Sequence, residues 1–284
     1  SLLFVPPAKG GGMEIFMKLL FTDLDGTLLN NDSQVSPDTK AFLDEFLLAG
    51  NKLILSSGRP KDSILEVKNN AGLTQPGVIL ICSNGTQVYD CDSMQTIMEK
   101  RLPLPYVTYL QAQAAKYNVH IHTYRDDAVV SPYDDEEIKF YRRRIHLPLI
   151  VSENLADALT IPPYKMLAIS LDDFDKLEAF RLGIQDWAQS KIQTIYSNGI
   201  YLELFPYDAG KGNAVRFVCD YFGVPLSDAY AAGDADNDIS MLEAAGCSIA
   251  MANAADSVKQ FADVVTDLDN DHDGLADMMR KLLG

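Results

Sequence analysis

The stretch that decides the fold is KLLFTDLDGTLLN, residues Lys18–Asn30. It begins as an apolar run that ends in Asp23, and Leu24-Asp25-Gly26-Thr27 follows directly. Two carboxylates two residues apart at a strand end can both project into the crevice beyond a parallel sheet, where open α/β sheets bind their ligands. Gly26 permits the sharp turn that the backbone needs there. On its own the motif leaves a second interpretation open, an Asx turn whose acids only cap a loop.

Strands and helices alternate after this stretch. Ser36-Pro37 is typical of a helix start, and apolar residues at helical spacing predict a helix that ends near Gly50. A strand at 52–57, a helix at 60–71 and a strand at 78–84 follow. This rhythm indicates the α/β class, with a parallel sheet that helices cover on both faces.

The pattern changes after residue 84 and returns at Lys211. VHIHTY, residues 119–124, alternates with period two, and Asn198-Gly199 lies between two apolar runs as the turn of a hairpin. Helices are expected at about 105–117, 134–145 and 174–189. From Lys211 on, the alternation of strands and helices returns, with a helix at 213–222, a strand at 229–234 and a helix from Ile239. We therefore expect a core of residues 17–84 and 207–284, interrupted by an α+β unit at 85–206. Residues 1–16 are expected to be a flexible leader or a remnant of cloning.

Three more polar groups stand at predicted strand ends or helix starts. Ser56-Ser57-Gly58-Arg59 offers a hydroxyl and backbone N–H groups, which suit a phosphate cradle. Lys211 opens a helix, either as a phosphate ligand or as an ordinary exposed charge. Gly233-Asp234-x-x-Asn237-Asp238 is a set of hard oxygen ligands suited to Mg²⁺, or else an N-cap cluster. Each motif is weak alone, and their common placement is what gives them weight.

Together and in this order, the motifs resemble those of haloacid dehalogenase (HAD) superfamily phosphatases, and within them the Cof-like sugar-phosphatase branch. The resemblance runs from Met17 almost to the end of the chain, through ILSSGRP, AGKGNAV and AAGDADNDISMLEAAG. It implies a Rossmann-like parallel-sheet core with an inserted α+β cap domain. The interval from Asp25 to Ser57 holds only one helix and one strand, whereas the interval from Ser57 to Lys211 is too long for one βα unit. The cap therefore lies between the second and third motifs, as in the α/β-capped subclass.

The resemblance also implies roles for individual residues. Asp23 is the expected nucleophile, which forms an aspartyl-phosphate, and Asp25 is the expected general acid and base. The Asp23 carboxylate, the Asp25 backbone carbonyl and Asp234 are expected to hold Mg²⁺. The other expected site residues are the phosphate-binding Ser57, Gly58, Lys211 and Asn237 and the supporting Thr27 and Asp238. The implied activity is Mg²⁺-dependent hydrolysis of small phosphorylated metabolites, with sugar phosphates as the expected class.

Candidate sites outside the core motifs are less specific. Asn84 and Gly85, at the crossing from core to cap, are expected to act as a hinge or to line the pocket. His120 and His122 share one face of a predicted strand, and we expect that face to look onto the substrate, with solvent exposure as the alternative. Asp269-x-Asp271-x-Asp273 resembles the start of an EF-hand loop, but Arg280 stands where that loop needs a glutamate, so no calcium is expected.

Composition narrows the choice of partners. The 284 residues include 40 Asp and Glu against 24 Lys and Arg, a formal charge of −16. Such a chain repels nucleic acid and anionic lipid, although a bound cation can still attract one small phosphorylated ligand. No apolar run is long enough for a membrane span. Four scattered cysteines fit a reducing compartment, so we expect a cytoplasmic protein. The sequence does not indicate the oligomeric state.

Two other functions stay open at this point. A phosphomutase of the phosphomannomutase type would share the motifs, but it needs a second phosphate site in the cap, and none is identifiable in the sequence. A catalytically idle regulator that binds a phosphosugar would be expected to have lost a motif residue.

Overall fold

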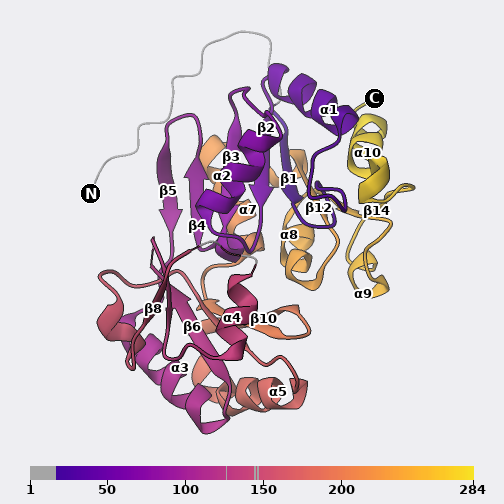
Figure 1. Cartoon of the computed structure of the whole chain (residues 1–284). Helices are drawn as coiled ribbons and strands as arrows, with labels where there is room; N and C mark the ends of the chain where they lie inside the picture. The colour runs from indigo at the N-terminus through magenta and orange to yellow at the C-terminus, as the bar shows by residue number, and fades with distance from the viewer. Residues whose placement is uncertain (1–16, 126, 144, 146) are drawn as a thin grey trace.

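The computed structural model of the protein describes residues 17–284 except residues 126, 144 and 146. The expected leader, residues 1–16, lies outside the described residues. The chain forms two units, each built on its own β-sheet, and one lies above the other in Figure 1.

The larger sheet has eight strands in the order β14-β13-β12-β1-β2-β3-β4-β5. Six of them are parallel: β1 (Leu19–Asp23), β2 (Lys52–Ser56), β3 (Val78–Cys82), β12 (Ala229–Gly233), β13 (Cys247–Ala250) and β14 (Val264–Val265). The strands β4 (Gln87–Asp90) and β5 (Gln95–Glu99) continue the sheet in antiparallel pairing. The alternating strands and helices predicted from the sequence thus do form a mostly parallel sheet.

Helices cover both faces of this sheet. One face packs against α1 (Pro37–Leu48), α2 (Lys61–Asn70) and α10 (Gly274–Leu283), and the other against α7 (Lys211–Phe222), α8 (Ile239–Ala244) and α9 (Asp256–Lys259). Neighbours on β1 therefore serve different layers, since Leu20 joins the first layer while Leu19 and Phe21 join the second. The Ser36 side chain caps α1 by accepting the N–H of Thr39 at 3.1 Å, so the expected helix start is confirmed.

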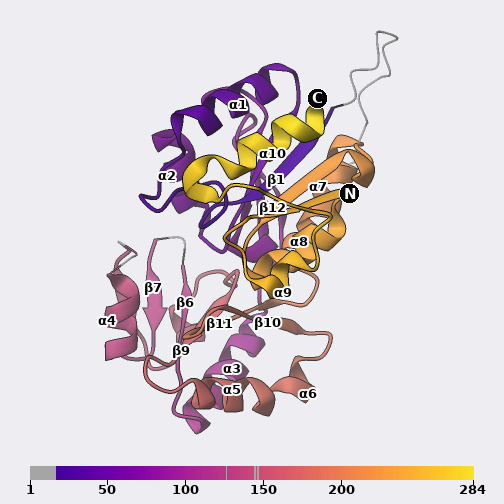
Figure 2. The same cartoon turned by 90° about the vertical axis from the view of Figure 1, so that its right-hand side faces the viewer.

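The smaller sheet has six strands in the order β10-β11-β9-β6-β7-β8. They are β6 (His120–Tyr124), β7 (Val129–Ser131), β8 (Leu149–Val151), β9 (Met166–Ile169), β10 (Ile192–Asn198) and β11 (Tyr201–Pro206). Figures 1 and 2 both show α3 (Leu104–Lys116) and α5 (Phe174–Gly183) on the side away from the larger sheet, and Figure 2 shows α6 (Gln185–Ala188) there as well. The other face packs against α4 (Glu136–Arg142).

One expected boundary is corrected. The sequence placed everything from residue 85 in the inserted unit, yet β4 and β5 belong to the larger sheet, and the inserted unit begins near Leu104. The reason is the 3₁₀ turn Ser83–Gly85, where Ser83, Asn84 and Gly85 all have positive φ and send the chain back alongside β3. Period-two alternation identifies a strand but not the sheet that it joins.

This arrangement gathers the functional loops at one place. The carboxyl ends of β1, β2, β3 and β12 are adjacent because these strands are parallel neighbours, and they face the inserted unit (Figure 2).

Four further 3₁₀ turns complete the chain: Leu155–Ala158, Leu226–Asp228, η4 (Asp236–Asp238) and η5 (Asn270–His272). Among the described residues, none of the helices combines the length and the apolar character that crossing a membrane requires.

Candidate active site

A cleft of about 1030 Å³ separates the two units. Its core wall is formed by the ends of β1 and β2 and the start of α2, and its cap wall by the inner face of the smaller sheet. Residues that line it include Asp23, Asp25, Ser57, Gly58, Arg59, Tyr124, Tyr141, Lys165, Tyr201, Glu203 and Asn237.

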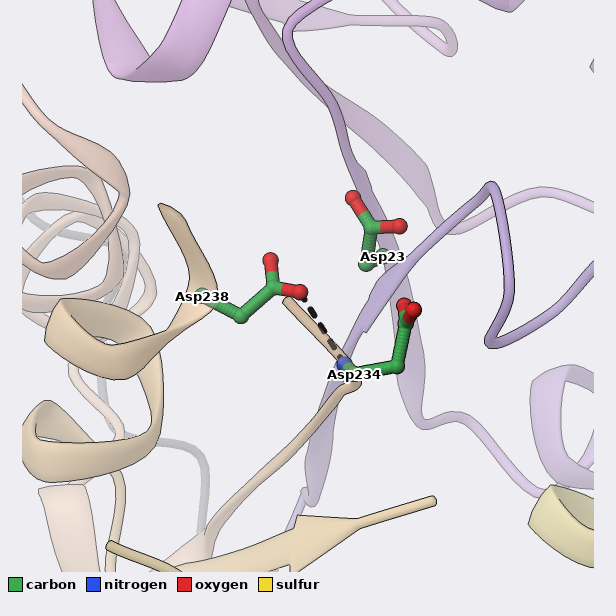
Figure 3. Close-up of side chains that lie close together, drawn as sticks. All are labelled: Asp23, Asp234 and Asp238. Atoms are coloured by element: carbon green, nitrogen blue, oxygen red, sulfur yellow. Dashed lines mark hydrogen bonds between the residues drawn. The ribbon is translucent and has the colours of Figure 1, made fainter. Parts of the chain in front are cut away.

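Three carboxylates meet at the core end of the cleft. Asp23 is the last residue of β1, Asp234 follows β12 directly, and Asp238 closes η4. One oxygen from each lies within 4.8 Å of the other two, and Figure 3 shows the three side chains gathered around one point. Within the part of the chain that the structure describes, no other set of three such ligands comes together in this way.

Lys211 is the cation of this cluster. Its Nζ lies 2.6 Å from Asp23 Oδ1, 2.6 Å from Asp238 Oδ1 and 3.2 Å from the carbonyl oxygen of Ser56. The side chain is fully buried, and it reaches the strand ends from the first turn of α7. Burial alone would lower the pKa of Lys211, but the charges of Asp23 and Asp238 raise this pKa above its ordinary value, so the lysine stays charged.

Backbone and side-chain contacts hold the other two carboxylates. Asp238 Oδ2 accepts the N–H groups of Asp234 and Ala235, each at 3.1 Å, which shapes the loop after β12. Thr27 donates its hydroxyl to Asp234 Oδ1 at 2.8 Å. Gly26 has a φ of +83°, and a Cβ there would collide with the Asp234 carboxylate. Of the expected supporting residues, Thr27 therefore contacts the cluster and Asp238 is one of its three carboxylates.

The cluster carries more negative charge than Lys211 can balance. Burial raises the pKa of Asp23 well above its ordinary value, and the charge of Asp238 adds to the effect. Burial, with a further contribution from Asp238, raises the pKa of Asp234 to about 6. Two buried carboxylates and a half-buried one, with surplus negative charge, fit Mg²⁺, because a divalent cation would offset the cost of keeping the carboxylates ionised. The donor set is thus suited to the expected metal.

Asp25 stands apart from the cluster on the cleft wall. Its side chain is about half exposed. Arg59 donates to both carboxylate oxygens of Asp25, from Nε to Oδ2 at 2.9 Å and from Nη2 to Oδ1. Arg59 was not singled out in the sequence, since an arginine in a turn carries no signal of its partner. The contact orients a carboxyl group that is open to whatever enters the cleft.

The other expected phosphate-binding residues line the same cleft as Asp23. Ser57 is buried at the end of β2, and its Oγ accepts the N–H of Arg59 at 3.2 Å. Gly58 and Asn237 also line the cleft. Asn237 donates to Asn84 Oδ1 at 3.3 Å, which holds its amide at the junction of the two units.

Comparison with known proteins identifies the family. Residues 20–279 match the sequence profile of a family described as haloacid dehalogenase-like hydrolase. The chain belongs to this family. A HAD hydrolase with an inserted cap is the architecture that the motif spacing predicted, and the fold class is confirmed.

Several relatives are named as phosphatases. The chain is 30% identical to 5-amino-6-(5-phospho-D-ribitylamino)uracil phosphatase YwtE of Bacillus subtilis, over 94% of this chain and 98% of that protein. It is 29% identical to phosphatase YwpJ of the same organism, over 94% of this chain and 100% of that protein. A haloacid dehalogenase-like hydrolase from Bacteroides thetaiotaomicron superposes with a TM-score of 0.82 at 28% identity, covering 94% of this chain and 99% of that one. By family and relatives, this HAD protein is a phosphoric monoester hydrolase.

The histidines do not reach the cleft wall. His120 and His122 lie on the expected face of β6, but α4 covers that face and both side chains are buried. Asp135 contacts His120 Nδ1 at 2.7 Å, His120 contacts His122, and His122 Nε2 contacts the hydroxyl of Tyr124 at 3.1 Å. The substrate-lining role expected for the two histidines is therefore wrong, and Tyr124 in front of them lines the cleft instead. The alternative, solvent exposure, is wrong as well.

Ser83 lines the cleft, and the buried Asn84 contacts two cleft residues, donating to Glu203 Oε2 at 2.9 Å and accepting from Asn237. A Cβ on Gly85 would collide with the backbone of Gly210, so the outgoing and returning chains touch here. Both roles expected of Asn84 and Gly85, a hinge and pocket lining, stay predictions.

The acidic turn near the C-terminus has structural partners. Asp271 accepts hydrogen bonds from Asn31, and Asp273 accepts them from Ser36 and Thr39, the latter at 2.8 Å. These bonds fasten η5 to the loop before α1, which accounts for the carboxylates without an ion.

Lys165 and Glu203 of the cleft wall were missed in the sequence. A single glutamate in the apolar run of β11 was the available signal, because an acid on the inner face of a covered sheet needs a partner. The partner, Lys165, precedes β9 and is 38 residues away, so no local pattern connects the two.

Proposed function

We propose that this HAD phosphatase is Mg²⁺-dependent and hydrolyses small phosphorylated metabolites, sugar phosphates in particular, through an aspartyl-phosphate on Asp23. The observation that carries the proposal is the placement of Asp23 at the core end of the cleft, paired with Lys211 and flanked by two more carboxylates. Asp25, two residues further on, stands in the wall of the same cleft.

In the first step a carboxylate oxygen of Asp23 attacks phosphorus, and the bond to the leaving oxygen breaks. Asp25 gives its proton to that oxygen, and Arg59 holds the Asp25 carboxyl group in place. In the second step Asp25 takes a proton from water while the water oxygen displaces Asp23 from phosphorus. The sum is one phosphoester and one water converted to one alcohol and inorganic phosphate.

Positive charge is the main requirement of this chemistry, because the nucleophile and the phosphoryl group are both anions. Lys211 supplies one charge, and Ser57 and Asn237, which line the same cleft, would donate to phosphoryl oxygens. Asp23 and Asp234, with the backbone carbonyl of Asp25, would hold Mg²⁺, and Asp238 would position the loop. When bound, the cation supplies electrostatic stabilisation to the transferring group.

The substrate class is supported by the relatives. Besides YwtE, a second B. subtilis relative at 29% identity, YitU, carries the same phosphatase name. A solved structure that shares the fold, with a TM-score of 0.76 at 22% identity, is described as a HAD subclass IIB sugar phosphatase. A cytoplasmic location stays a prediction, and the four cysteines are free.

The test is a phosphate-release screen over a panel of phosphorylated metabolites with Mg²⁺, repeated with EDTA. We expect release from sugar monophosphates that EDTA abolishes. Release that survives EDTA would remove the metal from the mechanism. Isomerisation of a sugar phosphate without net release would indicate the phosphomutase, and binding without turnover would indicate the idle regulator.

A further inference from the structure

A glutamate on the cap wall of the cleft has no role in the chemistry above. Glu203 lies on β11, is only 5% exposed and lines the cleft. Tyr201 shares its sheet face, and Leu167 lies opposite it on β9; both line the cleft as well. A carboxylate so close to a phosphate site would repel the substrate unless another group balances its charge.

Lys165 is that group. Its Nζ lies 2.7 Å from Glu203 Oε2 and 2.9 Å from the carbonyl oxygen of Gly58. Asn84 donates to the same Glu203 Oε2 at 2.9 Å. Both donors therefore occupy one carboxylate oxygen, and no hydrogen bond to Oε1 is found among the described residues. Because a carboxylate oxygen only accepts, Oε1 is available to accept a hydrogen bond from a donor in the cleft.

The position of Oε1 tells which part of a substrate it can meet. Gly58 follows Ser57 of the expected phosphate site, and a Cβ on Gly58 would lie 3.4 Å from Glu203 Oε1. The carboxylate thus borders the phosphate site from the cap side. A group that reaches Oε1 belongs to the portion of the substrate just beyond the phosphoester oxygen, which is the leaving group.

We infer that Glu203 determines leaving-group specificity, with its Oε1 accepting a hydrogen bond from a leaving-group hydroxyl while Lys165 and Asn84 hold the carboxylate in place. The inference rests on the proposed phosphatase function. A polyhydroxylated, uncharged leaving group supplies the donor, whereas a second phosphate would place another anion against the carboxylate. The selected class is sugar or polyol monophosphates, and bisphosphates are rejected.

The variant Glu203→Gln provides the sharpest test. Lys165 and Asn84 both donate to Oε2, so the amide oxygen of glutamine must take that position. Its NH₂ group then faces the substrate, which turns the acceptor into a donor. We would measure kcat/KM on glucose 6-phosphate, glucose 1,6-bisphosphate and p-nitrophenyl phosphate, whose leaving group has no hydroxyl besides the reacting oxygen.

For glucose 6-phosphate we expect kcat/KM to fall about 10- to 100-fold, the usual size for a lost hydrogen bond to a charged group. The loss on p-nitrophenyl phosphate should be clearly smaller, and the ratio of bisphosphate to monophosphate hydrolysis should rise. Equal losses on all three substrates would overturn the inference, since a merely structural role affects them alike.

Two further variants complete the design. Glu45→Gln removes the same charge from an exposed residue of α1 that does not line the cleft, and its substrate ratios should match the wild type. If Glu203→Gln unfolds because Lys165 has lost its partner, the double variant Glu203→Gln/Lys165→Met removes both charges, and thermal unfolding shows whether it is folded. A wild type that releases no phosphate from any probe would overturn the proposed function itself, and this inference with it.

Discussion

At the residue scale, activity depends on charge balance around Asp23. Lys211 contacts both Asp23 and Asp238 at 2.6 Å, while the third carboxylate, Asp234, is held by Thr27. Each of these contacts joins residues far apart in the sequence. The motifs predicted which residues take part, but their pairing depends on the strand order.

The variant Asp23→Asn is expected to abolish turnover and to leave the fold intact. The amide oxygen of asparagine can still accept from Lys211, but it is a far weaker nucleophile than a carboxylate. We expect phosphate release below about one-thousandth of the wild-type rate and an unfolding free energy within about 1 kcal/mol of it.

Asp236→Asn is the matched control, because Asp236 is an exposed residue of η4 that does not belong to the carboxylate cluster. It should behave like the wild type in both measurements. Near-normal phosphate release by Asp23→Asn would sink the assignment of the nucleophile.

At the element scale, the cap wall of the cleft depends on how α4 covers β6. Asp135 caps α4 by accepting the N–H of Ile138 at 3.0 Å, and its other oxygen contacts His120. The contacts then run through His122 to Tyr124. This polar row joins α4 to the smaller sheet. It explains why the two histidines, which were predicted to face the substrate, are buried instead.

The row predicts a pH dependence of stability. Burial, and then the neighbouring His120, lower the pKa of His122 well below its ordinary value, so the folded protein keeps this imidazole neutral. The unfolded chain takes up a proton near pH 6.5, and stability therefore falls below about pH 6.5 by up to about 1.4 kcal/mol per pH unit. Denaturation at a series of pH values should show a shallower fall for His122→Asn.

His272→Asn is the control for this experiment, since His272 is an exposed residue of η5. The difference in stability between it and the wild type should change little between pH 7 and pH 5. If His122→Asn follows the wild-type curve, the neutral buried imidazole is contradicted.

A second element-scale prediction concerns the turn after β3. Gly85 has a φ of +87°, and a Cβ there would meet the backbone of Gly210 and lie 2.9 Å from Lys211 N. Gly85→Ala should cost about 1–3 kcal/mol of stability and also reduce phosphate release, because it displaces the start of α7.

Gly199→Ala offers the comparison, since a Cβ on Gly199 meets no atom within 4 Å. Its cost should stay within about 0.5 kcal/mol. Similar losses in the two variants, measured by urea denaturation, would contradict the close approach as the cause.

At the scale of the whole molecule, the cleft is formed where the two units meet. At the core end of the cleft, three carboxylates lie near one buried lysine, and without a further cation it costs free energy to keep all three ionised. The bonds from Lys165 to Gly58 and from Asn84 to Glu203 join the core wall to the cap wall. Both walls of the cleft are therefore held by the same junction.

We expect Mg²⁺ to raise the temperature of unfolding by several degrees, because a ligand that binds only the folded state at 100 times its Kd adds about 2.7 kcal/mol. Scanning calorimetry with Mg²⁺ and with EDTA measures this shift without reference to activity. Asp234→Asn should lose most of the shift, while Asp236→Asn should keep it. If the wild type unfolds at the same temperature in Mg²⁺ as in EDTA, the metal site is excluded.

The alternation of strands and helices in the core, the order of the motifs and the family could be predicted from the sequence. These features depend on local patterns and on the spacing from Asp25 through Ser57 to Lys211. The remaining features depend on tertiary contacts. These contacts assign β4 and β5 to the core sheet, bury His120 and His122 under α4, and pair Glu203 with Lys165. Sheet membership, coverage and ion pairing are contacts between distant segments, and a strand pattern is the same whichever neighbour it finds.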